Sequence, residues 1–484
     1  MNEISQAPKA LPPLYVDLDG TLIKSDLALE SLFALLKAEP LCLFLIPLWL
    51  LRGRAHFKAE LARRIKIDPA ALNYDDRLMN RLRADHAQGR RIVLATASHR
   101  RYAEAVAQHV GFFDAVLASD ETRNLKSRRK LEAIVEDAGG QPFDYAGNET
   151  ADLPIWAAAR TAIVVNAPKS VIQKARRLTS TEVFERAGGS YPRIVLKAIR
   201  VHQWLKNALV FLPLFAGHQS GNLALDLKTL AAFFAFGLCA SSIYVLNDLS
   251  DLQSDRLHPR KRKRPFASGA LPLSHGVALI PILLGSSLLI ALAAGLPLPF
   301  FGVLAIYYVS SLSYNFLAKD RAIWDVIILA GLYALRVLAG VAATGIPPSF
   351  WLLAFSMFIF LSLALVKRYA EMLAMQRLGK NQAHGRGYVT DDMPLLQSMG
   401  VASGYLAVLV MALYLNSPEI HLQYAHPKLL WTICPLLLFW ISRIWLKTHR
   451  GQMHDDPVVF AASDKLSLII AVICALSLGL AGPI

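Results

Sequence analysis

The chain of 484 residues carries a formal net charge of +15, and 54% of its residues are hydrophobic while 18% are charged. Its mean hydropathy of +0.38 excludes an ordinary soluble protein, and its charged fraction excludes one that lies wholly within a membrane. We therefore expect two parts, one soluble and one embedded in a bilayer.

The N-terminal part, residues 1–165, mixes strand-like and helical patterns. Its first residues, MNEISQAPKALPPLYVDLDG, have no apolar core behind a basic start, so they do not predict a signal peptide. We therefore expect this part to remain in the cytoplasm.

The segment PLYVDLDGTL is a short apolar strand that ends in Asp17 and Asp19, followed by Gly and Thr. It resembles the first motif of haloacid-dehalogenase-type (HAD) phosphatases, in which the first aspartate attacks phosphorus and the second protonates the leaving oxygen. Later motifs follow in order: Thr96 ends the strand RIVLATAS, and Lys130, with Lys126 as the alternative, opens a helix. Four such motifs in order are a strong signal.

The last HAD motif departs from its pattern. The family usually has G-D-x-x-x-D, whereas this chain has Gly147 and Asn148, and then Asp152. An amide oxygen binds Mg²⁺ but adds no negative charge, so the sequence does not decide how tightly this site binds the metal. The alternative is a domain that has lost its activity and has a purely structural role. The resemblance implies an α/β Rossmannoid fold with a helical cap over about residues 27–88. It also implies Mg²⁺ between Asp17, the Asp19 carbonyl and Asn148, with Asp152 as ligand or orienting partner.

Between the first two motifs lies an apolar stretch, EPLCLFLIPLWLLRGR. Its eleven uninterrupted apolar residues, Leu41 to Leu51, are too few to span a bilayer. One interpretation is a buried cap helix that kinks at Pro47. The other is a cap that enters the bilayer surface and places Arg52 and Arg54 at the lipid headgroups. A phosphatase that acts on a lipid-linked sugar would need the second.

The composition changes near residue 190, after the polar stretch AGGSYPR. We predict a HAD-like domain over residues 1–170, a linker over 171–192 and a membrane domain over 193–484. Beyond the linker come nine apolar runs of roughly 20 residues, the length that spans a bilayer. A single run could be a buried core helix, but nine in series predict an all-α polytopic domain. The runs are centred near residues 209, 238, 286, 307, 334, 358, 405, 437 and 474.

The charge of the connecting segments predicts the orientation. Even-numbered runs precede segments rich in Lys and Arg, such as 256–264, whereas odd-numbered runs precede segments nearly free of them, such as GLPLP. By the positive-inside rule, the N-terminus and the charged loops lie in the cytoplasm, and an odd number of spans places Ile484 outside. We expect a multi-pass protein of the inner membrane, and no nucleic-acid partner for its basic runs.

The segment Asn247–Asp255, here called the acidic segment, follows the second apolar run and precedes a run of basic residues. On a helix, Asn247, Asp248, Asp251 and Asp255 fall at about 0°, 100°, 40° and 80°, so the four side chains share one face. Such oxygen donors suit Mg²⁺, which commonly completes its shell with substrate phosphates. The alternative is a solvated acidic helix end, which the position at the mouth of the membrane argues against.

The pattern N-D-x-x-D-x-x-x-D, closing in HPRKRKRP, resembles the first motif of the UbiA-type membrane prenyltransferase superfamily. The second motif is usually another D-x-x-x-D that holds a second magnesium, but here Asp325 is followed four residues later by Leu329. The chain also contains the stretches IRVHQWLKN, YNFLAKDRAIWD, LALVKRYAEM and HGRGY. Together with the missing second carboxylate, they make the chain resemble the polyprenyl-phosphate phosphoribosyltransferases, the family typified by decaprenyl-phosphate phosphoribosyltransferase. The resemblance implies transfer of 5-phosphoribose from phosphoribosyl pyrophosphate to a polyprenyl phosphate, with release of pyrophosphate.

A donor that carries a pyrophosphate and a 5-phosphate needs a metal and further cations. Asp248, Asp251 and Asp255 are the candidate catalytic carboxylates. Asp325 and Arg336 lie in one span, about 20° apart in projection, so we expect them to face the bundle interior and serve the site or each other. The basic candidates could instead anchor lipid headgroups. The predicted substrate contacts are Lys206, Asn207, Asn247, Arg260, Lys261, Arg264, Tyr314, Lys319, Asp325, Arg336, Lys367 and Arg368.

Two other functions stay open. An aromatic prenyltransferase with a polyprenyl pyrophosphate donor fits the first motif, although the missing partner of Asp325 argues against it. A non-enzymatic transporter would have the spans but leaves the acidic segment unexplained. In our main hypothesis the HAD-like domain removes the 5-phosphate of the lipid-linked product. Asp17 would form an aspartyl-phosphate, Asp19 would act as acid and then base, Thr96 would hold the phosphoryl group and Lys130 would stabilise the charge of Asp17.

Overall fold

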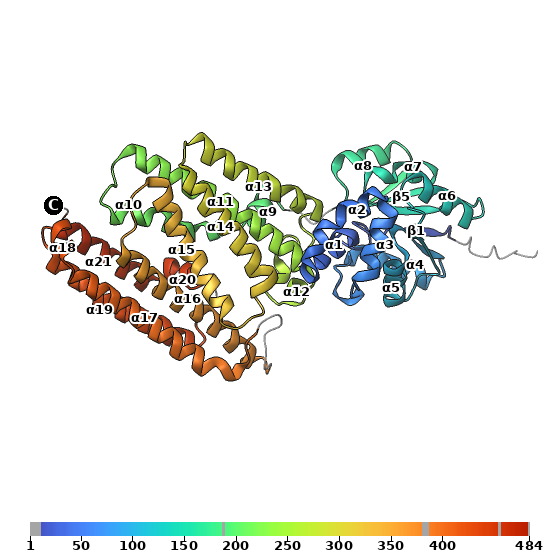
Figure 1. Ribbon diagram of the computed structural model, residues 1–484. Helices are drawn as coiled ribbons and strands as arrows, with labels where there is room; N and C mark the ends of the chain where they lie inside the picture. The colour runs from blue at the N-terminus through green and yellow to red at the C-terminus, as the bar shows by residue number, and fades with distance from the viewer. Residues whose placement is uncertain (1–10, 186–188, 380–386, 454–455, 483–484) are drawn as a thin grey trace, which may run out of the picture. The chain divides into compact units, whose positions relative to one another are not determined.

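The computed structural model describes residues 11–185, 189–379, 387–453 and 456–482 (Figure 1). They form two compact units. The first combines Met1–Ile199 with Tyr244–Ile280, and the second combines Arg200–Ile243 with Pro281–Ile484. The acidic segment therefore belongs to the first unit by its contacts, although it follows a long helix of the second.

The first unit is built on a six-stranded sheet with the strand order β3-β2-β1-β4-β5-β6, in which every pair is parallel. Alternate residues of β1 pack on opposite faces: Leu14 and Val16 join one core cluster and Tyr15 joins another. Both faces are thus buried, as expected for a parallel sheet between helices. The strands are β1 (Leu14–Val16), β2 (Ile92–His99), β3 (Ala115–Ser119), β4 (Asp144–Gly147), β5 (Thr161–Val165) and β6 (Ser180–Phe184).

Helices cover the two faces of this sheet. Residues of α4 (Asp76–Ala87) and α5 (Arg100–Val110) pack in the cluster that contains Leu14. Residues of α6 (Arg128–Asp137), α7 (Leu153–Ala158) and α8 (Lys169–Arg176) pack in the cluster that contains Tyr15. The predicted α/β domain is therefore confirmed.

The sheet extends beyond the expected domain boundary at residue 170. Helix α8 and strand β6 lie in the stretch interpreted as a linker, and β6 pairs with β5 from Ser180 to Phe184. Its sequence, STEVF, has three polar residues before two apolar ones and lacks the alternation typical of a half-buried strand, so nothing in it predicted a strand beyond residue 170.

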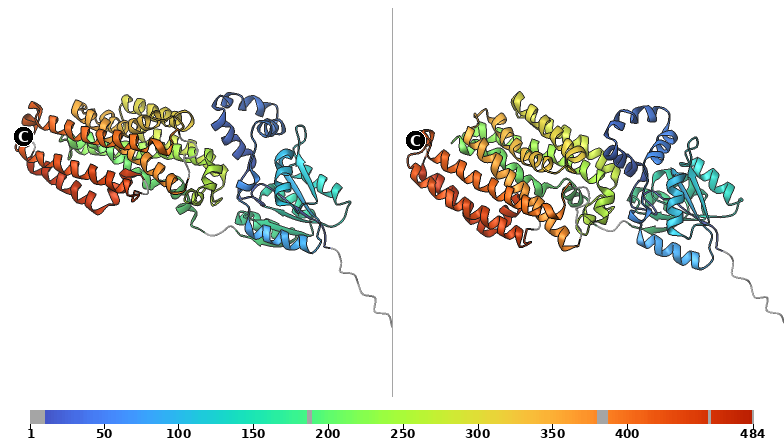
Figure 2. Two further views of the ribbon diagram at one scale, coloured as in Figure 1. Left: turned by 90° about the horizontal axis from the view of Figure 1, so that it is seen from below. Right: turned by 60° about the horizontal axis from the view of Figure 1, so that its bottom comes forward.

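The cap is a compact helical hairpin that projects from the sheet, dark blue in Figure 2. It consists of α1 (Leu27–Ala38), a 3₁₀ turn (Pro40–Phe44), α2 (Ile46–Leu51) and α3 (Arg54–Arg64). Of the eleven apolar residues from Leu41 to Leu51, only Cys42 and Trp49 are buried. The interpretation of this stretch as a buried helix is therefore wrong, and most of its apolar side chains face outward.

The second unit is helical and confirms a polytopic membrane domain. Among the described residues, seven helices are long and apolar enough to cross a membrane, or eight if α20 and α21, bent by 81°, form one span. The spans are α11 (Leu223–Ser250), α13 (Leu273–Ala293), α14 (Leu298–Ser313, continued by a π-helical turn, Tyr314–Ala318), α15 (Trp324–Thr344), α16 (Phe350–Arg377), α17 (Met393–Leu415), α19 (Ile433–His449), and the pair α20 (Pro457–Ser463) and α21 (Lys465–Ala481).

The nine predicted spans are not confirmed. The run near residue 209 forms a 3₁₀ stretch, Val201–Phe211, and a short helix, α10 (Leu212–Ala216). The physical reason is that this run carries Lys206 and Asn207, which are buried against polar partners of the second unit. The prediction that Ile484 lies outside requires an odd number of spans; seven or eight candidate spans leave it a prediction, and that residue lies outside the described ranges.

Close helix packing fixes the interior of the second unit. Gly400 of α17 lies against the indole of Trp445 on α19, where an added Cβ would come within 2.0 Å of a ring carbon. Trp445 Nε1 donates a hydrogen bond to Ser362 Oγ of α16 at 3.1 Å. Small residues permit such close approach of membrane helices, and the hydrogen bond fixes the contact. The buried polar residues described below are held in this framework.

Candidate functional site

The HAD-type motif residues converge at one edge of the sheet. Asp17 directly follows β1, Thr96 lies in β2, and Asn148 directly follows β4. Strands β2, β1 and β4 are neighbours and parallel, so their carboxyl ends meet at the same edge. Lys130 on α6 reaches this edge from the helical layer. The topology thus brings together residues that are more than 100 positions apart in the chain.

A buried charge network surrounds Asp17. Lys130 Nζ lies 2.8 Å from Asp17 Oδ1 and 4.0 Å from Asp152 Oδ1, and all three side chains are buried. Lys130 also donates to the hydroxyl of Tyr145, which in turn donates to Asp152 Oδ1 at 2.9 Å. Lys126, the alternative lysine, instead pairs with Glu149 in solvent. The geometry therefore favours Lys130 over Lys126.

Asp19 is held by two hydrogen bonds. Its Oδ1 accepts a hydrogen bond from the backbone N–H of Leu27 at 2.8 Å, and its Oδ2 accepts one from the hydroxyl of Ser98. Thr96 Oγ1 accepts a hydrogen bond from Ser98 N at 3.0 Å. Ser98 was not identified from the sequence, although its position two residues after Thr96 on β2 could have indicated it.

Burial raises the pKa values of both aspartates. Desolvation, together with the charge of Asp26, raises the pKa of Asp19 to about 7. Desolvation also raises the pKa of Asp17 to about 6, although the ammonium of Lys130 opposes the shift. A divalent cation bound beside these aspartates would favour their charged forms and oppose this effect of burial.

The oxygen donors at this edge fit Mg²⁺. Asn148 Oδ1 accepts a hydrogen bond from Thr21 Oγ1 at 3.3 Å, and a Cβ on Gly20 would lie 2.1 Å from Asn148 Nδ2, so the amide sits directly on the loop after Asp19. Asp152 Oδ2 accepts hydrogen bonds from the backbone N–H groups of Asn148 and Glu149, which favours the orienting role over that of a ligand. Among the described residues, no three His, Cys, Asp or Glu side chains form a metal cluster, so Mg²⁺ here would rely on the carboxylate of Asp17 together with carbonyl and amide oxygens.

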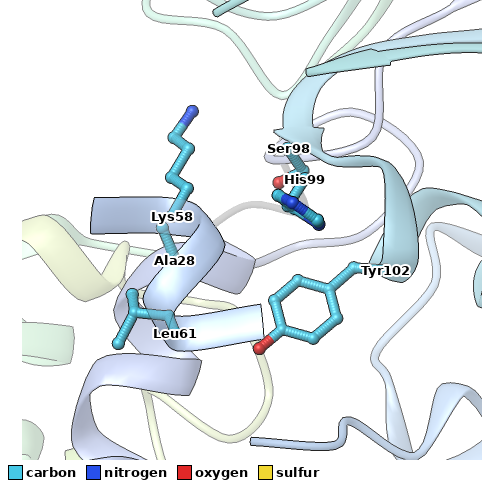
Figure 3. Close-up of a pocket in the computed structure, with 6 residues that line it drawn as sticks. All are labelled: Ala28, Lys58, Leu61, Ser98, His99 and Tyr102. Atoms are coloured by element: carbon cyan, nitrogen blue, oxygen red, sulfur yellow. The ribbon is translucent and has the colours of Figure 1, made fainter. Parts of the chain in front are cut away.

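A shallow pocket lies where the cap meets the core, between α1, α3, β2 and α5 (Figure 3). Lys58 of α3 lines it and donates to Ala97 O at 2.6 Å and to Asn124 Oδ1 at 3.3 Å. Burial lowers the pKa of Lys58, and the charges of Asp19 and Asp26 oppose this shift. Lys58 thus brings a cation from the cap to the edge that carries Asp19. No sequence signal distinguished it from its basic neighbours on α3.

The acidic segment begins at the end of α11 and continues into α12 (Leu252–Leu257). The helix is interrupted at Asp251, but the N–H of Asp251 donates to Asn247 O at 2.9 Å and that of Asp255 donates to Asp251 O at 2.8 Å. Helical hydrogen bonding therefore continues through the break. Asp248 and Asp255 are buried, whereas Asp251 is half-buried and pairs with Lys37 of the same unit at 2.6 Å.

Arg264 joins two of these carboxylates. Its Nη1 lies 3.1 Å from Asp248 Oδ1 and 2.6 Å from Asp255 Oδ2. Burial raises the pKa of Asp255, an effect that Arg264 opposes. The Oδ1 atom of Asn247 is buried without a hydrogen-bond partner, which suits an oxygen that binds a cation. The oxygen donors of the acidic segment are of the kind that Mg²⁺ prefers, although among the described residues its three aspartates do not form one metal cluster and are paired with Lys37 and Arg264. The side chains of Arg260 and Lys261 are exposed.

Asp325 and Arg336 are both buried in the second unit, as expected, but they are not partners. Asp325 Oδ2 lies 2.6 Å from Arg368 Nη2, and Tyr388 donates to Asp325 Oδ1 at 2.6 Å. Arg336 Nε donates to Asn207 Oδ1 at 3.0 Å. The idea that Asp325 and Arg336 serve each other is wrong, because Arg368 provides the charge that Asp325 requires.

A second buried cluster surrounds Asp456, which was not identified from the sequence. Lys206 Nζ lies 2.6 Å from Asp456 Oδ2, and Lys367 Nζ lies 3.8 Å from the same atom. The hydroxyl of Tyr333 donates to it at 3.0 Å. Two of the predicted phosphate-binding lysines thus meet at one carboxylate. Asp456 is 250 positions from Lys206 and belongs to no motif, so only the fold reveals it.

The two remaining predicted contacts lie at the end of α14. Tyr314 begins the π-helical turn, and its hydroxyl accepts a hydrogen bond from Arg368 Nη2 at 3.4 Å. Lys319 follows this turn and is half-buried. Arg368 therefore contacts both Tyr314 and Asp325, and it connects two of the predicted positions within the second unit.

An α/β domain with buried aspartates at one sheet edge, followed by a polytopic helical domain with an acidic segment, defines a two-domain membrane protein. The model of the UbiA prenyltransferase family matches residues 208–479, and that of the haloacid dehalogenase-like hydrolases matches residues 14–155. The chain therefore belongs to the UbiA prenyltransferase family and carries a HAD-like domain, as the sequence motifs indicated.

Several curated proteins are similar to this chain. An uncharacterized protein of Sinorhizobium fredii, y4nM, is 38% identical over 467 residues, which cover 96% of this chain and 90% of that protein. Nodulation protein NoeC of Azorhizobium caulinodans is 36% identical over 59% of this chain and 91% of its own length. Decaprenyl-phosphate phosphoribosyltransferase of Mycolicibacterium smegmatis is 38% identical over 191 residues, 38% of this chain and 59% of that enzyme.

The solved structures that match part of this chain include one of a UbiA homolog from Archaeoglobus fulgidus, bound to DMAPP and Mg²⁺. It is 16% identical, covers 59% of this chain and 98% of its own, and has a TM-score of 0.45. A digeranylgeranylglyceryl phosphate synthase is 19% identical, covers 60% of this chain and 98% of its own, and has a TM-score of 0.43.

Proposed function

We propose that the chain transfers 5-phosphoribose from phosphoribosyl pyrophosphate to a polyprenyl phosphate, and that its HAD-like domain then removes the 5-phosphate of the lipid-linked product. The substrate class is supported by the 38% identity to decaprenyl-phosphate phosphoribosyltransferase, of which the chain matches 59%. The acidic segment supports a metal-assisted displacement, because its oxygen donors suit Mg²⁺.

The environment of Asp325 favours this reaction over an aromatic prenyltransferase. The usual second motif of the superfamily has another carboxylate four residues later, whereas this chain has Leu329. Asp325 itself contacts Arg368 and Tyr388, which compensate its charge inside the second unit. A carboxylate so compensated has little charge left for a second metal ion.

In the proposed transfer, an oxygen of the lipid phosphate forms a bond to C1 of the ribose as the bond from C1 to the pyrophosphate breaks. Mg²⁺ held by the acidic segment would supply charge neutralisation for the leaving group. Arg264 holds Asp248 and Asp255 in place. Arg260 and Lys261, exposed on the following turn, are candidates to bind phosphate oxygens. Positioning and charge neutralisation would account for most of the rate enhancement.

In the proposed hydrolysis, a carboxylate oxygen of Asp17 bonds to phosphorus as the ester bond to the ribose oxygen breaks, and Asp19 gives its proton to that oxygen. The raised pKa of Asp19 suits a proton donor near neutral pH. Asp19 then takes a proton from water as the water oxygen displaces Asp17. Lys130, 2.8 Å from Asp17, stabilises the carboxylate, and Thr96 holds the phosphoryl group.

The proposal places the HAD-like domain and the acidic segment on the cytoplasmic face of the inner membrane. Phosphoribosyl pyrophosphate is soluble in water, so it must reach its site from an aqueous compartment. The basic residues that follow α11, from Arg256 to Arg264, support this side by the positive-inside rule.

The transfer step is tested with membranes that contain the protein and labelled phosphoribosyl pyrophosphate. Label should enter lipid only when a polyprenyl phosphate is added, and pyrophosphate should appear in step with the lipid-linked sugar. Membranes with Asp248→Asn provide the matched control. Prenylation of 4-hydroxybenzoate without any sugar transfer would replace this proposal with the aromatic prenyltransferase.

The hydrolysis step is tested separately with Asp17→Asn. Sugar transfer should continue while the phosphorylated lipid accumulates, because only the nucleophile of the HAD-like domain is lost. Asp76→Asn, an exposed aspartate at the start of α4, should behave as wild type. If the wild-type protein accumulates the phosphorylated lipid to the same extent with Mg²⁺ present, the domain does not act on this product.

A further inference from the structure

The cap presents a group of exposed apolar side chains that come from one short segment of the chain. Leu51 is 84% exposed, Leu41 79% and Phe44 74%, whereas Leu178, an isolated exposed leucine of the same unit, is 45% exposed. Single exposed hydrophobics need no explanation, but a contiguous patch marks a binding surface. We call this surface the cap patch, and it is formed by Leu41, Leu43, Phe44, Leu48, Leu50 and Leu51.

The outward direction of the cap patch is fixed by the cap's own core. Cys42 and Trp49, seven positions apart, lie on the inner face with Leu35 and Leu61. Arg64 covers the indole of Trp49 at 5.1 Å and pairs with Glu39 at 3.2 Å, which ties α3 to the end of α1. The inner positions are therefore filled, and the remaining apolar residues have no place inside the cap.

Basic side chains border the cap patch. Arg52 and Arg54 are exposed on either side of Gly53, which turns the chain from α2 into α3 with φ of 107°. The sequence between Glu39 and Glu60 contains no acidic residue. An apolar surface with a basic border complements a bilayer whose headgroups are anionic.

We propose that the cap patch enters the surface of the bilayer, with its apolar side chains at the boundary of headgroups and acyl chains and with Arg52 and Arg54 among anionic headgroups. The same chain carries at least seven helices of membrane-spanning length in its described residues, so the patch is tethered to a bilayer at high effective concentration. The inference does not require the HAD-like domain to be active.

Membrane insertion of the cap would serve the pocket between cap and core. Lys58 and Leu61, which line this pocket, lie on α3, directly after the basic border (Figure 3). A cap held at the surface would keep the pocket where the phosphate of a lipid-linked substrate lies. The class of ligand for the patch itself is a lipid surface.

The test uses the full-length chain with Cys42, Cys239, Cys434 and Cys474 replaced by alanine and a single new cysteine, Phe44→Cys, labelled with an environment-sensitive fluorophore. The protein is reconstituted in vesicles of phosphatidylcholine with one quarter phosphatidylglycerol. We expect quenching by lipids that carry a nitroxide on the acyl chain, and protection from aqueous iodide. Because Phe44 is 74% exposed, its replacement should not disturb folding, which the thermal unfolding curve checks.

Two outcomes would overturn the proposal. Iodide quenching without lipid quenching would show a patch in water. Protection from both quenchers would show a patch covered by protein, and nanodiscs with one or two copies would then distinguish the chain's own helices from a second copy. The matched control is Leu178→Cys, an isolated exposed leucine just after α8, which should be quenched by iodide alone.

A second variant tests the basic border. Arg52→Glu together with Arg54→Glu should reduce the lipid quenching at Phe44→Cys by about half in the anionic vesicles, and much less in vesicles of phosphatidylcholine alone. Both arginines are exposed, so the cap should remain folded. Equal quenching with and without the arginines in anionic vesicles would overturn their assignment to the headgroups.

Discussion

The site around Asp17 and the acidic segment both gather buried aspartates, but they compensate the charge differently. In the first, Lys130 contacts Asp17, and Tyr145 and Asp152 hold the lysine in turn. In the second, one arginine, Arg264, joins two carboxylates, and its side chain is still 28% exposed. Lys130 is therefore fixed by a network of neighbours, whereas Arg264 is fixed mainly by the two carboxylates it joins.

This difference follows from how the two sites are built. The parallel sheet collects the first site from distant parts of the chain and surrounds each side chain with fixed neighbours. The acidic segment consists of consecutive helical turns, and its spacing sets the positions of the carboxylates before any tertiary contact forms. A network tolerates the loss of one charge less well than a local cluster does, and substitutions in each site should reveal this.

The ion pair of Asp325 and Arg368 is the most deeply buried of the pairs described above, because both side chains are fully buried. Arg368→Met should lower the free energy of unfolding by about 3–5 kcal/mol, since it leaves an unpaired buried carboxylate. Combining it with Asp325→Asn should restore much of the loss. Thermal unfolding in detergent measures both. If the double variant is as unstable as Arg368→Met alone, the arginine contributes by packing and not by pairing.

Replacement of the acidic carboxylates should have the next largest effect. Asp248→Asn, Asp251→Asn and Asp255→Asn should each slow sugar transfer at least about a hundredfold, or about 2.7 kcal/mol, because each removes a charge that holds the metal at the leaving group. Initial rates in membranes measure this. Asp226→Asn, near the other end of α11, is the matched control. Near wild-type rates in two of the three variants would contradict the magnesium assignment.

The local features of both sites could be predicted from the sequence. Motif order identified Asp17, Thr96 and Lys130, and the parallel sheet places them at one edge because motifs that follow neighbouring strands must meet there. Helical spacing brought Asp248 and Asp255 to one face, where Arg264 now joins them. Both inferences depend on the regular geometry of strands and helices, and the spacing of residues in the sequence reflects this geometry directly.

The long-range partners could not be predicted. The contacts Lys206 to Asp456 and Asp325 to Arg368 depend on how the helices pack, and nothing in the local pattern encodes them. The conformation of residues 201–211 could not be predicted either: their apolar content indicated a regular helix, whereas the chain forms a 3₁₀ stretch in which Lys206 and Asn207 make buried polar contacts. Composition measures whether a segment can enter a membrane, and tertiary partners influence the conformation that it adopts there.

Replacing the amide of Asn148 with a carboxylate would add a single negative charge to the site around Asp17. Asn148→Asp should lower the Mg²⁺ concentration needed for half-maximal effect by about tenfold, because a carboxylate adds negative charge where the amide contributes only an oxygen. The Mg²⁺-dependent rise in unfolding temperature measures it without reference to turnover. Asn80→Asp, on the exposed side of α4, is the control. An unchanged Mg²⁺ dependence would remove Asn148 from the metal site.

The smallest effect concerns the cap patch, which lies outside both sites. Phe44→Glu should slow hydrolysis of a lipid-linked phosphate by about threefold, because a charge at this position weakens contact with the bilayer surface. Hydrolysis of a water-soluble phosphate ester should not change, since Phe44 does not line the pocket between cap and core. Leu178→Glu, the same kind of change at an isolated exposed leucine, should affect neither substrate. An equal loss on both substrates would mean that the cap patch stabilises the cap, and that its contact with lipid does not govern access to the pocket.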